Sequence, residues 1–339
     1  MTDLARRKLL KAAAIAPVIP LASSLSLPAY AADFTYKFGH SFPLNHPLHV
    51  GLVAAAEKTA KDTNGALRIE VFGAAQLGGD TQQISQLRSG ALEFFTTAGL
   101  ILSTFVPVAS IYGLGFAFSD YPQVWRAMDG DLGNHIRGAF SKAGVVPFDT
   151  VWDNGFRQIS TSARPITQPD DLKGLKLRVP VSPLYTSMFK ALGASPASLN
   201  LSEVYSALQT KLVDGQENPL VVFETAKFFE VQKYVSLTNH LWDGSWLLAS
   251  KSAWEALPAD MRSIVARNFN AAGIAQRASA EQLNNSLRTS LATKGIVFNQ
   301  PNHDAFRSAL KTAGFYRQWK DKFDPQAWAL LTKYATGIE

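Results

Sequence analysis

A strand–helix–strand alternation that occurs twice along the chain restricts its fold more than any other feature of the sequence. The first series starts with a strand-like stretch at 34–39 and continues through a helical pattern to an alternating strand at 67–72. A second series starts after Gly155 and runs to about Asp243. Because helices that alternate with strands favour parallel pairing, the pattern predicts an α/β fold with a largely parallel sheet. With 339 residues, two domains are expected rather than one.

The last part of the chain departs from this alternation. Residues 259–294 form one continuous helical pattern without proline and with a single glycine, Gly273. At 1.5 Å per residue such a helix is about 50 Å long, which is enough to cross two domains. A coiled coil is not expected, because Ala, Asn and Ser stand at candidate seam positions and break the heptads.

The first 31 residues have the features of a secretion signal. Arg6 and Arg7 form a twin-arginine pair ahead of the apolar stretch 12–27, and Ala29-Tyr30-Ala31 offers a small-x-small cleavage site. Prolines interrupt the apolar stretch, which is also short for a membrane span, so an uncleaved anchor is disfavoured. We therefore expect a twin-arginine signal peptide at 1–31 and a mature chain that works in the periplasm.

The composition excludes several classes of function. The chain has no cysteines, which rules out disulfides, thiolate metal sites and cysteine nucleophiles. Its formal charge of +6 falls to +3 without the leader, since 1–31 holds four of the 33 basic residues and one of the 27 acidic residues. The remaining charges form no basic run, so a nucleic-acid partner is not expected.

Motifs of common enzymes are also missing from the sequence. There is no P-loop and no His-Glu-x-x-His pair, and Gly244-Ser245-Trp246 does not fit a Gly-x-Ser-x-Gly nucleophile turn. No cofactor is expected, because Gly113-Leu114-Gly115 lacks the third glycine of a dinucleotide-binding loop. Three histidines, His40, His46 and His49, could suggest a metal, but no carboxylate completes the set. We therefore expect neither an enzyme nor a resident metal site.

Arg178 is the most unusual residue of the second series. It ends a short strand-like alternation just before Pro180, where a packed core would hold valine or isoleucine. A guanidinium in such a place needs an anionic partner, since an unpaired buried charge is strongly unfavourable. The neighbouring sequence offers no carboxylate. We therefore expect the partner to be a ligand carboxylate, held by two parallel N–H···O bonds.

Three polar motifs connect the chain to a known family: Gly155-Phe156-Arg157, Leu177-Arg178-Val179-Pro180 and Asp214-Gly215-Gln216-Glu217-Asn218-Pro219. In this order and spacing, the chain resembles the solute-binding proteins of tripartite ATP-independent periplasmic (TRAP) transporters, of the dicarboxylate-binding DctP type. The resemblance covers essentially the whole mature chain and includes the stretches 75–80 and 207–210. It implies a periplasmic protein that captures a small organic acid through its carboxylate and delivers it to a membrane permease.

The resemblance also implies how the chain is divided. The family fold is a two-lobed clamp, with a ligand cleft between the lobes and a long helix that spans both. One lobe would comprise residues 32–154 and 245–284, and the other 155–244 and 285–339. The ligand bridges the lobes and therefore favours the closed state. The expected partners are a small carboxylate and the TRAP permease subunits, and the protein itself is expected to be a monomer.

Site residues follow from the resemblance motif by motif. The principal carboxylate-binding arginine of the family corresponds to Arg178, its second arginine to Arg157 and its asparagine to Asn218. The first lobe contributes positions that correspond to His40, Ser41, Thr97, Ala98 and Gly99. Family members that bind sialic acid have a glutamate at the position of Ala98, which argues against that ligand and leaves this end of the pocket less polar. Candidate walls there are Phe42, Trp152, Leu201 and Trp242.

Alternatives stay open on the residues alone. Arg157 could be a surface arginine, Asn218-Pro219 a simple turn, and Trp152 and Trp242 ordinary core residues. A periplasmic sensing module that presents a bound acid to a receptor would share this sequence, and a hydrolytic enzyme is the least favoured function. The ligand could be a sugar acid, a dicarboxylate, or an aromatic or branched 2-oxo or 2-hydroxy acid, and the weakly polar loop after residue 97 favours the less polar ones. Some family members bind their ligand as a calcium salt, so an accompanying metal also stays open.

Overall fold

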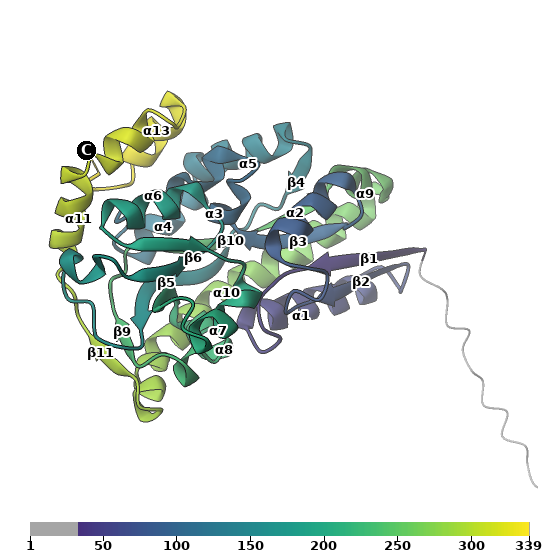
Figure 1. The fold of residues 1–339 in the computed structure, drawn as a ribbon. Helices are drawn as coiled ribbons and strands as arrows, with labels where there is room; N and C mark the ends of the chain where they lie inside the picture. The colour runs from purple at the N-terminus through teal and green to yellow at the C-terminus, as the bar shows by residue number, and fades with distance from the viewer. Residues whose placement is uncertain (1–32, 339) are drawn as a thin grey trace, which may run out of the picture. The chain divides into compact units, whose positions relative to one another are not determined.

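The computed structural model describes residues 33–338, and Figure 1 shows how their helices and strands are arranged. The signal peptide that we expect at 1–31 lies outside the described residues. Between residues 33 and 338, none of the helices is long and apolar enough to span a membrane. The predicted α/β class is confirmed, but the sheet is mixed rather than largely parallel.

The first strand–helix series folds as its sequence pattern predicts. α1 (Pro47–Asp62) connects β1 (Phe34–Gly39) to β2 (Leu67–Phe72), and α2 (Asp80–Ser89) leads from β2 to β3 (Phe94–Ala98). β1 pairs in parallel with both β2 and β3. β3 is buried along its whole length, as expected of a strand that is covered on both faces.

The second series builds the other half of the sheet. β6 (Lys176–Val179) pairs in parallel with β7 (Ser195–Ser198) and with β8 (Gly215–Pro219). α6 (Pro183–Ala191) connects β6 to β7, and α7 (Leu201–Gln209) connects β7 to β8. Arg178 therefore projects from an inner strand of the sheet.

Two long strands join the halves and make the sheet mixed. β5 (Trp152–Thr161) and β10 (Trp242–Ser250) lie at its centre, in the order β2-β1-β3-β10-β5-β8-β6-β7. β10 pairs antiparallel with β3 and β5, and β5 pairs antiparallel with β8. The motif around Gly155 thus lies inside a strand. The φ of Gly155 is +109°, a backbone conformation that favours glycine. Beside Gly155, the pairing of β5 with β10 shifts register between Asp243 and Gly244.

The segment before β5 differs from its sequence pattern. The apolar run 145–152 predicts one strand, but β4 covers only Val145–Pro147, and β5 begins at Trp152. In the gap, the N–H of Thr150 donates to Oδ1 of Asn270 over 3.1 Å, and Nε of Arg277 donates to the carbonyl of Val151 over 2.9 Å. Side chains from a helix thus replace a neighbouring strand here, which local apolar character cannot reveal.

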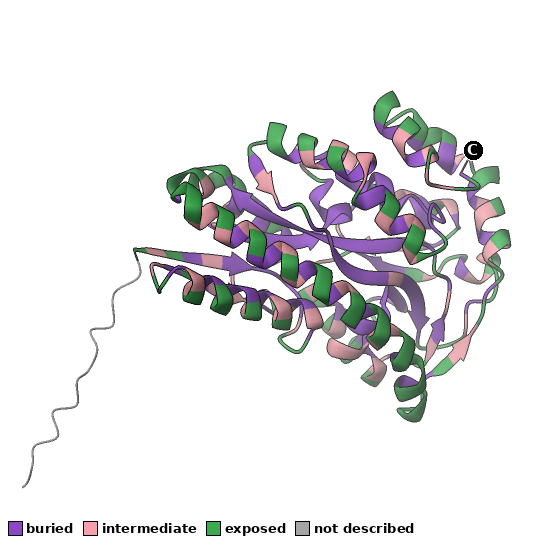
Figure 2. Ribbon diagram, turned by 180° about the vertical axis from the view of Figure 1, so that it is seen from behind, coloured by how far each residue is buried: buried purple, intermediate pink, exposed green. Residues whose placement is uncertain are grey.

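That helix is α10 (Ala259–Thr293), and its 35 residues match the predicted long helix. It packs against α1, β5 and α8 (Leu220–Thr225), and so crosses from one half of the sheet to the other (Figure 1). Its outward face is exposed and its inward face buried (Figure 2). A Cβ at Gly273 would lie 2.6 Å from Nε1 of Trp152, so this close packing against β5 requires glycine.

Gln276 fixes the position of α10 on β5. Its Oε1 accepts from the N–H of Asp153 over 3.0 Å, and its Nε2 donates to the carbonyl of the same residue over 2.7 Å. Gln276 is 5% exposed, so these bonds are shielded from water. A single side chain therefore satisfies both backbone groups of Asp153.

β9 and β11 extend the sheet beside β5, and the remaining helices cover it and enclose two apolar cores. One core lies beneath α1, α8 and α10, and the other beneath α4, α5, α6 and the C-terminal helices. These elements are α3 (Gly99–Leu102), α4 (Tyr121–Met128), α5 (Asp131–Lys142), β9 (Tyr234–Ser236), α9 (Lys251–Ala256), β11 (Val297–Asn299), α11 (His303–Thr312), α12 (Phe315–Lys320) and α13 (Pro325–Thr332), with 3-10 turns at Pro107–Gly113, Pro169–Leu172 and Phe228–Glu230.

Candidate functional site

A cavity lies where the carboxyl ends of β1 and β3 meet the residues of β5, β6, β8 and β10. It contains about 390 Å³ of space between atoms, part of it open to solvent. Both halves of the sheet contribute to its lining: Ser41, Phe42, Asp80, Thr97, Ala98 and Ile101 from the first, and Asn154, Arg157, Arg178, Pro180, Tyr185, Leu201, Asn218 and Asp243 from the joining strands and the second. Eight of the twelve candidate site residues named from the sequence are among them.

Arg178 is 2% exposed and has unused hydrogen-bond donors. Its Nε and Nη2 both donate to the carbonyl of Leu199, over 3.1 and 2.6 Å, which fixes the plane of the guanidinium. Three of its five N–H groups are left for a ligand. Within residues 33–338, no carboxylate lies within ion-pair distance of it. Burial lowers the pKa of Arg178 to about 10, although Glu217 opposes this shift, so the charge is incompletely compensated.

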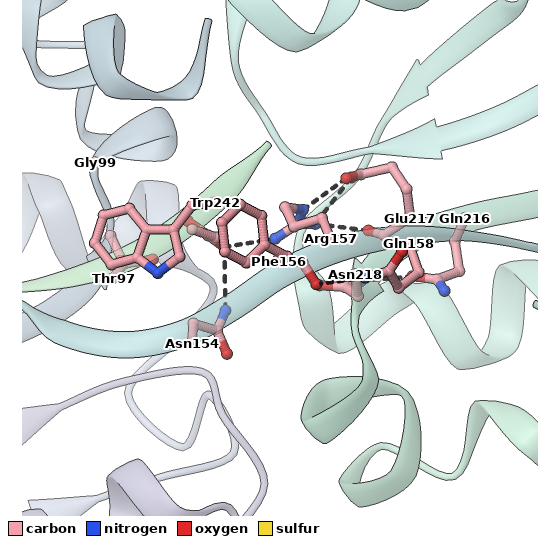
Figure 3. A network of polar contacts seen from close by, with 12 residues as sticks. Thr97, Gly99, Asn154, Phe156, Arg157, Gln158, Gln216, Glu217, Asn218 and Trp242 are labelled. Atoms are coloured by element: carbon pink, nitrogen blue, oxygen red, sulfur yellow. Dashed lines mark hydrogen bonds and ion pairs between the residues drawn. The ribbon is translucent and has the colours of Figure 1, made fainter. Parts of the chain in front are cut away.

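Arg157 is equally buried, but its charge is already paired. Its Nε and Nη2 donate to the Glu217 carboxylate over 2.6 and 2.8 Å, and its Nη1 donates to Oδ2 of Asp243 over 2.6 Å. A further bond from Nη2 reaches the Glu217 carbonyl, so four of its five N–H groups are used (Figure 3). Burial alone would lower the pKa of Arg157, but Glu217 and Asp243 raise it. The alternative of a surface arginine is wrong.

Asn218 belongs to β8, which is buried throughout, so the alternative of a simple turn is also wrong. Its Nδ2 donates to Oε1 of Gln216 over 2.5 Å, and Gln216 donates to Oγ of Ser160 over 2.7 Å. This chain orients the amide of Asn218 and uses one of its two N–H groups, as Figure 3 shows. The second N–H is available on the cavity side, near Arg178.

Glu217 points away from the cavity and holds its neighbours in place. Besides Arg157, it contacts Nε2 of His240 over 3.0 Å. Burial alone would raise the pKa of Glu217, but Arg157 and His240 keep it below its ordinary value. This carboxylate is therefore ionised at neutral pH and neutralises Arg157.

Asp80 also lines the cavity, and sequence reasoning missed it as a candidate site residue. It is the first residue of α2 and 3% exposed, and its Oδ1 accepts from Oγ1 of Thr97 over 3.0 Å. Burial raises its pKa, against the opposing effects of Ser41, Thr97 and Arg178. The stretch 75–80 belongs to the family resemblance, but an aspartate at a helix start also suits a cap, which hides its role.

Trp152 and Trp242 lie outside the cavity, which corrects the expectation that they form its walls. Trp152 is fully buried between β5, α1 and α10. Trp242 donates from Nε1 to Oδ1 of Asp153 over 2.7 Å and packs against Tyr112 and Trp125. Both indoles are therefore core residues. The apolar part of the lining comes from Phe42, Ala98, Ile101, Pro180 and Leu201 instead.

His40 is also absent from the lining, although it supports a residue that belongs to it. Its Nδ1 accepts from the N–H of Phe42 over 3.1 Å, and its Nε2 lies 2.9 Å from Nδ1 of His49. Burial lowers the pKa of His40 and of His46 to about 3, so both are neutral. In the part of the chain that the structure describes, no group of three His, Asp or Glu side chains could hold a metal ion.

Comparison with known proteins agrees with this geometry. Residues 38–320 match the model of the DctP family, described as bacterial extracellular solute-binding protein, family 7. A protein of Sinorhizobium fredii is 32% identical over 91% of this chain, and the match spans 56% of that longer protein.

Two solved structures show the fold and carry different ligands. A TRAP periplasmic solute-binding protein from Sulfurospirillum deleyianum with bound succinate is 30% identical, with a TM-score of 0.84, covering 89% of this chain and 98% of that one. A sugar-acid-binding protein from Advenella mimigardefordensis in complex with galactonate is 27% identical, with a TM-score of 0.86, covering 91% of this chain and 100% of that one.

Proposed function

Because the chain belongs to the DctP family of TRAP-transporter solute-binding proteins, we propose that it captures a small organic acid in the periplasm and delivers it to membrane permease subunits. Proteins of this family serve transport and are not enzymes. The proposal includes a monomeric mature protein that follows a twin-arginine signal peptide at residues 1–31.

The unpaired guanidinium of Arg178 carries the proposal for ligand capture. A carboxylate that receives two parallel bonds from its free end would supply the missing anionic partner. The second N–H of Asn218 would add a bond without burying another charge. Arg157 would contribute one donor at most, and its main effect would be to hold Glu217 and Asp243 in place.

The proposed lobes explain why both halves of the sheet line the cavity. One proposed lobe comprises residues 32–154 and 245–284, and the other comprises 155–244 and 285–339. The boundary between them crosses β5 and β10, the two strands that join the halves of the sheet. The glycine geometry and the register shift at this crossing support it as the place where the lobes move. A ligand that bridges the lobes would then shift the population toward the closed state.

Substitution of Arg178 tests the proposal. Arg178→Ala should leave a buried ligand carboxylate unpaired, which costs about 3–5 kcal/mol, or roughly two to four decades of affinity. The ligand is first found by a thermal-shift screen of the mature protein against carboxylates, neutral sugars and amines, and affinities are then measured by calorimetry. Arg68→Ala is a matched control, because this arginine is exposed on β2.

Two results would refute the proposal. In the first, Arg178→Ala folds normally and binds the ligand within about threefold of wild type, although two decades or more are expected. In the second, neutral sugars or amines stabilise the wild-type protein and carboxylates do not.

A further inference from the structure

The buried charges around the cavity contain more acid than base. Two guanidiniums, Arg157 and Arg178, face three carboxylates, Asp80, Glu217 and Asp243, and each of the five residues is at most 3% exposed. His240 beside Glu217 does not correct the balance, since burial lowers its pKa and leaves it neutral. Burial raises the pKa of both Asp80 and Asp243, and the charge of Glu217 adds a smaller increase at Asp243. Each further negative charge placed in the cavity without a pairing cation is therefore unfavourable.

Only one ligand carboxylate can be paired in this arrangement. Arg157 is held by Glu217 and Asp243, so Arg178 is the guanidinium with several free donors. A ligand whose carboxylate is bound at Arg178 shares the cavity with the carboxylate of Asp80, which also belongs to the lining. A second carboxylate on the ligand would share this cavity with Asp80 after Arg178 is paired with the first one, and like charges at a shared site repel strongly.

The lining of the cavity also suits hydroxyl groups. Oδ1 of Asp243 is buried, and no donor among residues 33–338 reaches it. The hydroxyl of Tyr185 is likewise buried without a partner, and both residues line the cavity. Buried polar atoms normally have hydrogen-bond partners, and a hydroxyl can donate to a carboxylate and accept from a phenol. Asp80 and Thr97 also line the cavity, so hydroxyls along the ligand would find further partners there.

Family membership does not decide between these ligands, since one solved relative contains succinate and another galactonate. We propose that this site selects a polyhydroxylated monocarboxylate, with Asp80 as the residue that rejects a second carboxylate. The inference rests on the proposed function and deepens it. It replaces the expectation of a less polar ligand, because the carboxylates in the lining outweigh its apolar residues. The cavity volume of about 390 Å³ limits the ligand to a small acid.

Matched ligands of equal chain length test the selection. The panel contains aldonates, unsubstituted dicarboxylates and unsubstituted monocarboxylates of four to six carbons, with D-erythronate and succinate as the four-carbon pair, and calorimetry gives the affinities. The wild-type protein should bind the best aldonate at least about tenfold more tightly than the dicarboxylate of the same length. Asp80→Asn should reduce this ratio about tenfold or more, by strengthening binding of the dicarboxylate and weakening binding of the aldonate.

Asp260→Asn is the matched control, because it removes the same charge at an exposed position in the first turn of α10. The ratio of aldonate affinity to dicarboxylate affinity in this control variant should equal that of the wild-type protein. A dicarboxylate or an unsubstituted acid as the tightest ligand would overturn the inference, as would an Asp80→Asn ratio within about threefold of wild type. If binding of that dicarboxylate or unsubstituted acid were still weakened by Arg178→Ala, the proposed function would stand. Failure of every carboxylate to bind would overturn both.

Discussion

Gly79 offers a direct test of the proposed clamp, because it contacts Asn200 across the two proposed lobes. A Cβ at position 79 would lie 3.0 Å from Cγ of Asn200 and 3.2 Å from its Nδ2 and Oδ1. Carbon contacts prefer about 3.5–4.0 Å. Asn200 cannot easily turn away, since its backbone N–H and its Nδ2 both donate to Glu203. We expect Gly79→Ala to oppose the closed arrangement in which these residues touch.

The expected size of the effect follows from this contact. Overpacking costs about 1–3 kcal/mol, which corresponds to roughly a 5- to 150-fold loss of ligand affinity. The backbone at Gly79 has φ −67° and ψ 168°, which alanine adopts without strain. Alanine also restricts the unfolded chain, which stabilises the fold by about 0.4–1 kcal/mol. If the proposed lobes separate in the ligand-free protein, that form should therefore unfold at the wild-type temperature or slightly above it.

Two measurements separate the effects of Gly79→Ala. Calorimetry gives the ligand affinity, and thermal unfolding without ligand gives the stability of the open protein. Gly138→Ala in α5 is the control, because a Cβ there has no atom within 4 Å outside its own helix. An unchanged affinity would refute the reasoning. So would a loss of ligand-free stability as large as the loss of binding energy, since the contact would then not be specific to the closed state.

Two further predictions concern stability. Glu217→Gln should lower the free energy of unfolding by about 3 kcal/mol, because it removes one of the carboxylates that neutralise buried Arg157; a change below about 1 kcal/mol in urea unfolding would contradict this ion-pair argument. Acid should also weaken the fold. Histidines of the unfolded chain bind protons near pH 6.5, whereas burial keeps the pKa of His40 and His46 at about 3. Asp153, whose pKa burial raises to about 7, binds a proton in the folded state and offsets one of the two. Taken together, these three groups lower the free energy of unfolding by about 1.4 kcal/mol per unit as the pH drops from about 6 to 4.5. His46→Asn should therefore reduce the pH dependence, and an unchanged slope would show that His46 takes up a proton in the folded protein.

Sequence patterns predicted those strands and helices whose bounds depend mainly on residues within the segment itself. The stretches 34–39 and 67–72 are strands with those bounds, and the long helix ends within one residue of its prediction. Arg178 could be identified because a charge inside an apolar strand pattern is anomalous wherever the strand packs. The antiparallel joining strands β5 and β10 could not be predicted, because their pairing depends on segments about 90 residues apart in sequence.

Residues whose role depends on burial by distant segments were harder to assign. Asp80 at a helix start and Asp243 after a tryptophan are ordinary in sequence, and only the folded chain encloses them beside two arginines. Trp152 and Trp242 were candidates for the pocket wall because a core indole and a ligand-facing indole have the same local pattern. The sequence therefore pointed to Arg178, which lines the cavity, but not to the carboxylates of Asp80 and Asp243 in the same lining.

The pair of bonds between Gln276 and Asp153 determines which motion α10 can make. A helix that slid along β5 would lose both bonds at once, whereas a helix that turned about this point would keep them. Asp153 is next to Asn154 in the cavity lining, so this point of attachment lies beside the ligand site. In the proposed division Asp153 and Gln276 belong to the same lobe, so this attachment would hold the middle of α10 on β5 while the lobes separate.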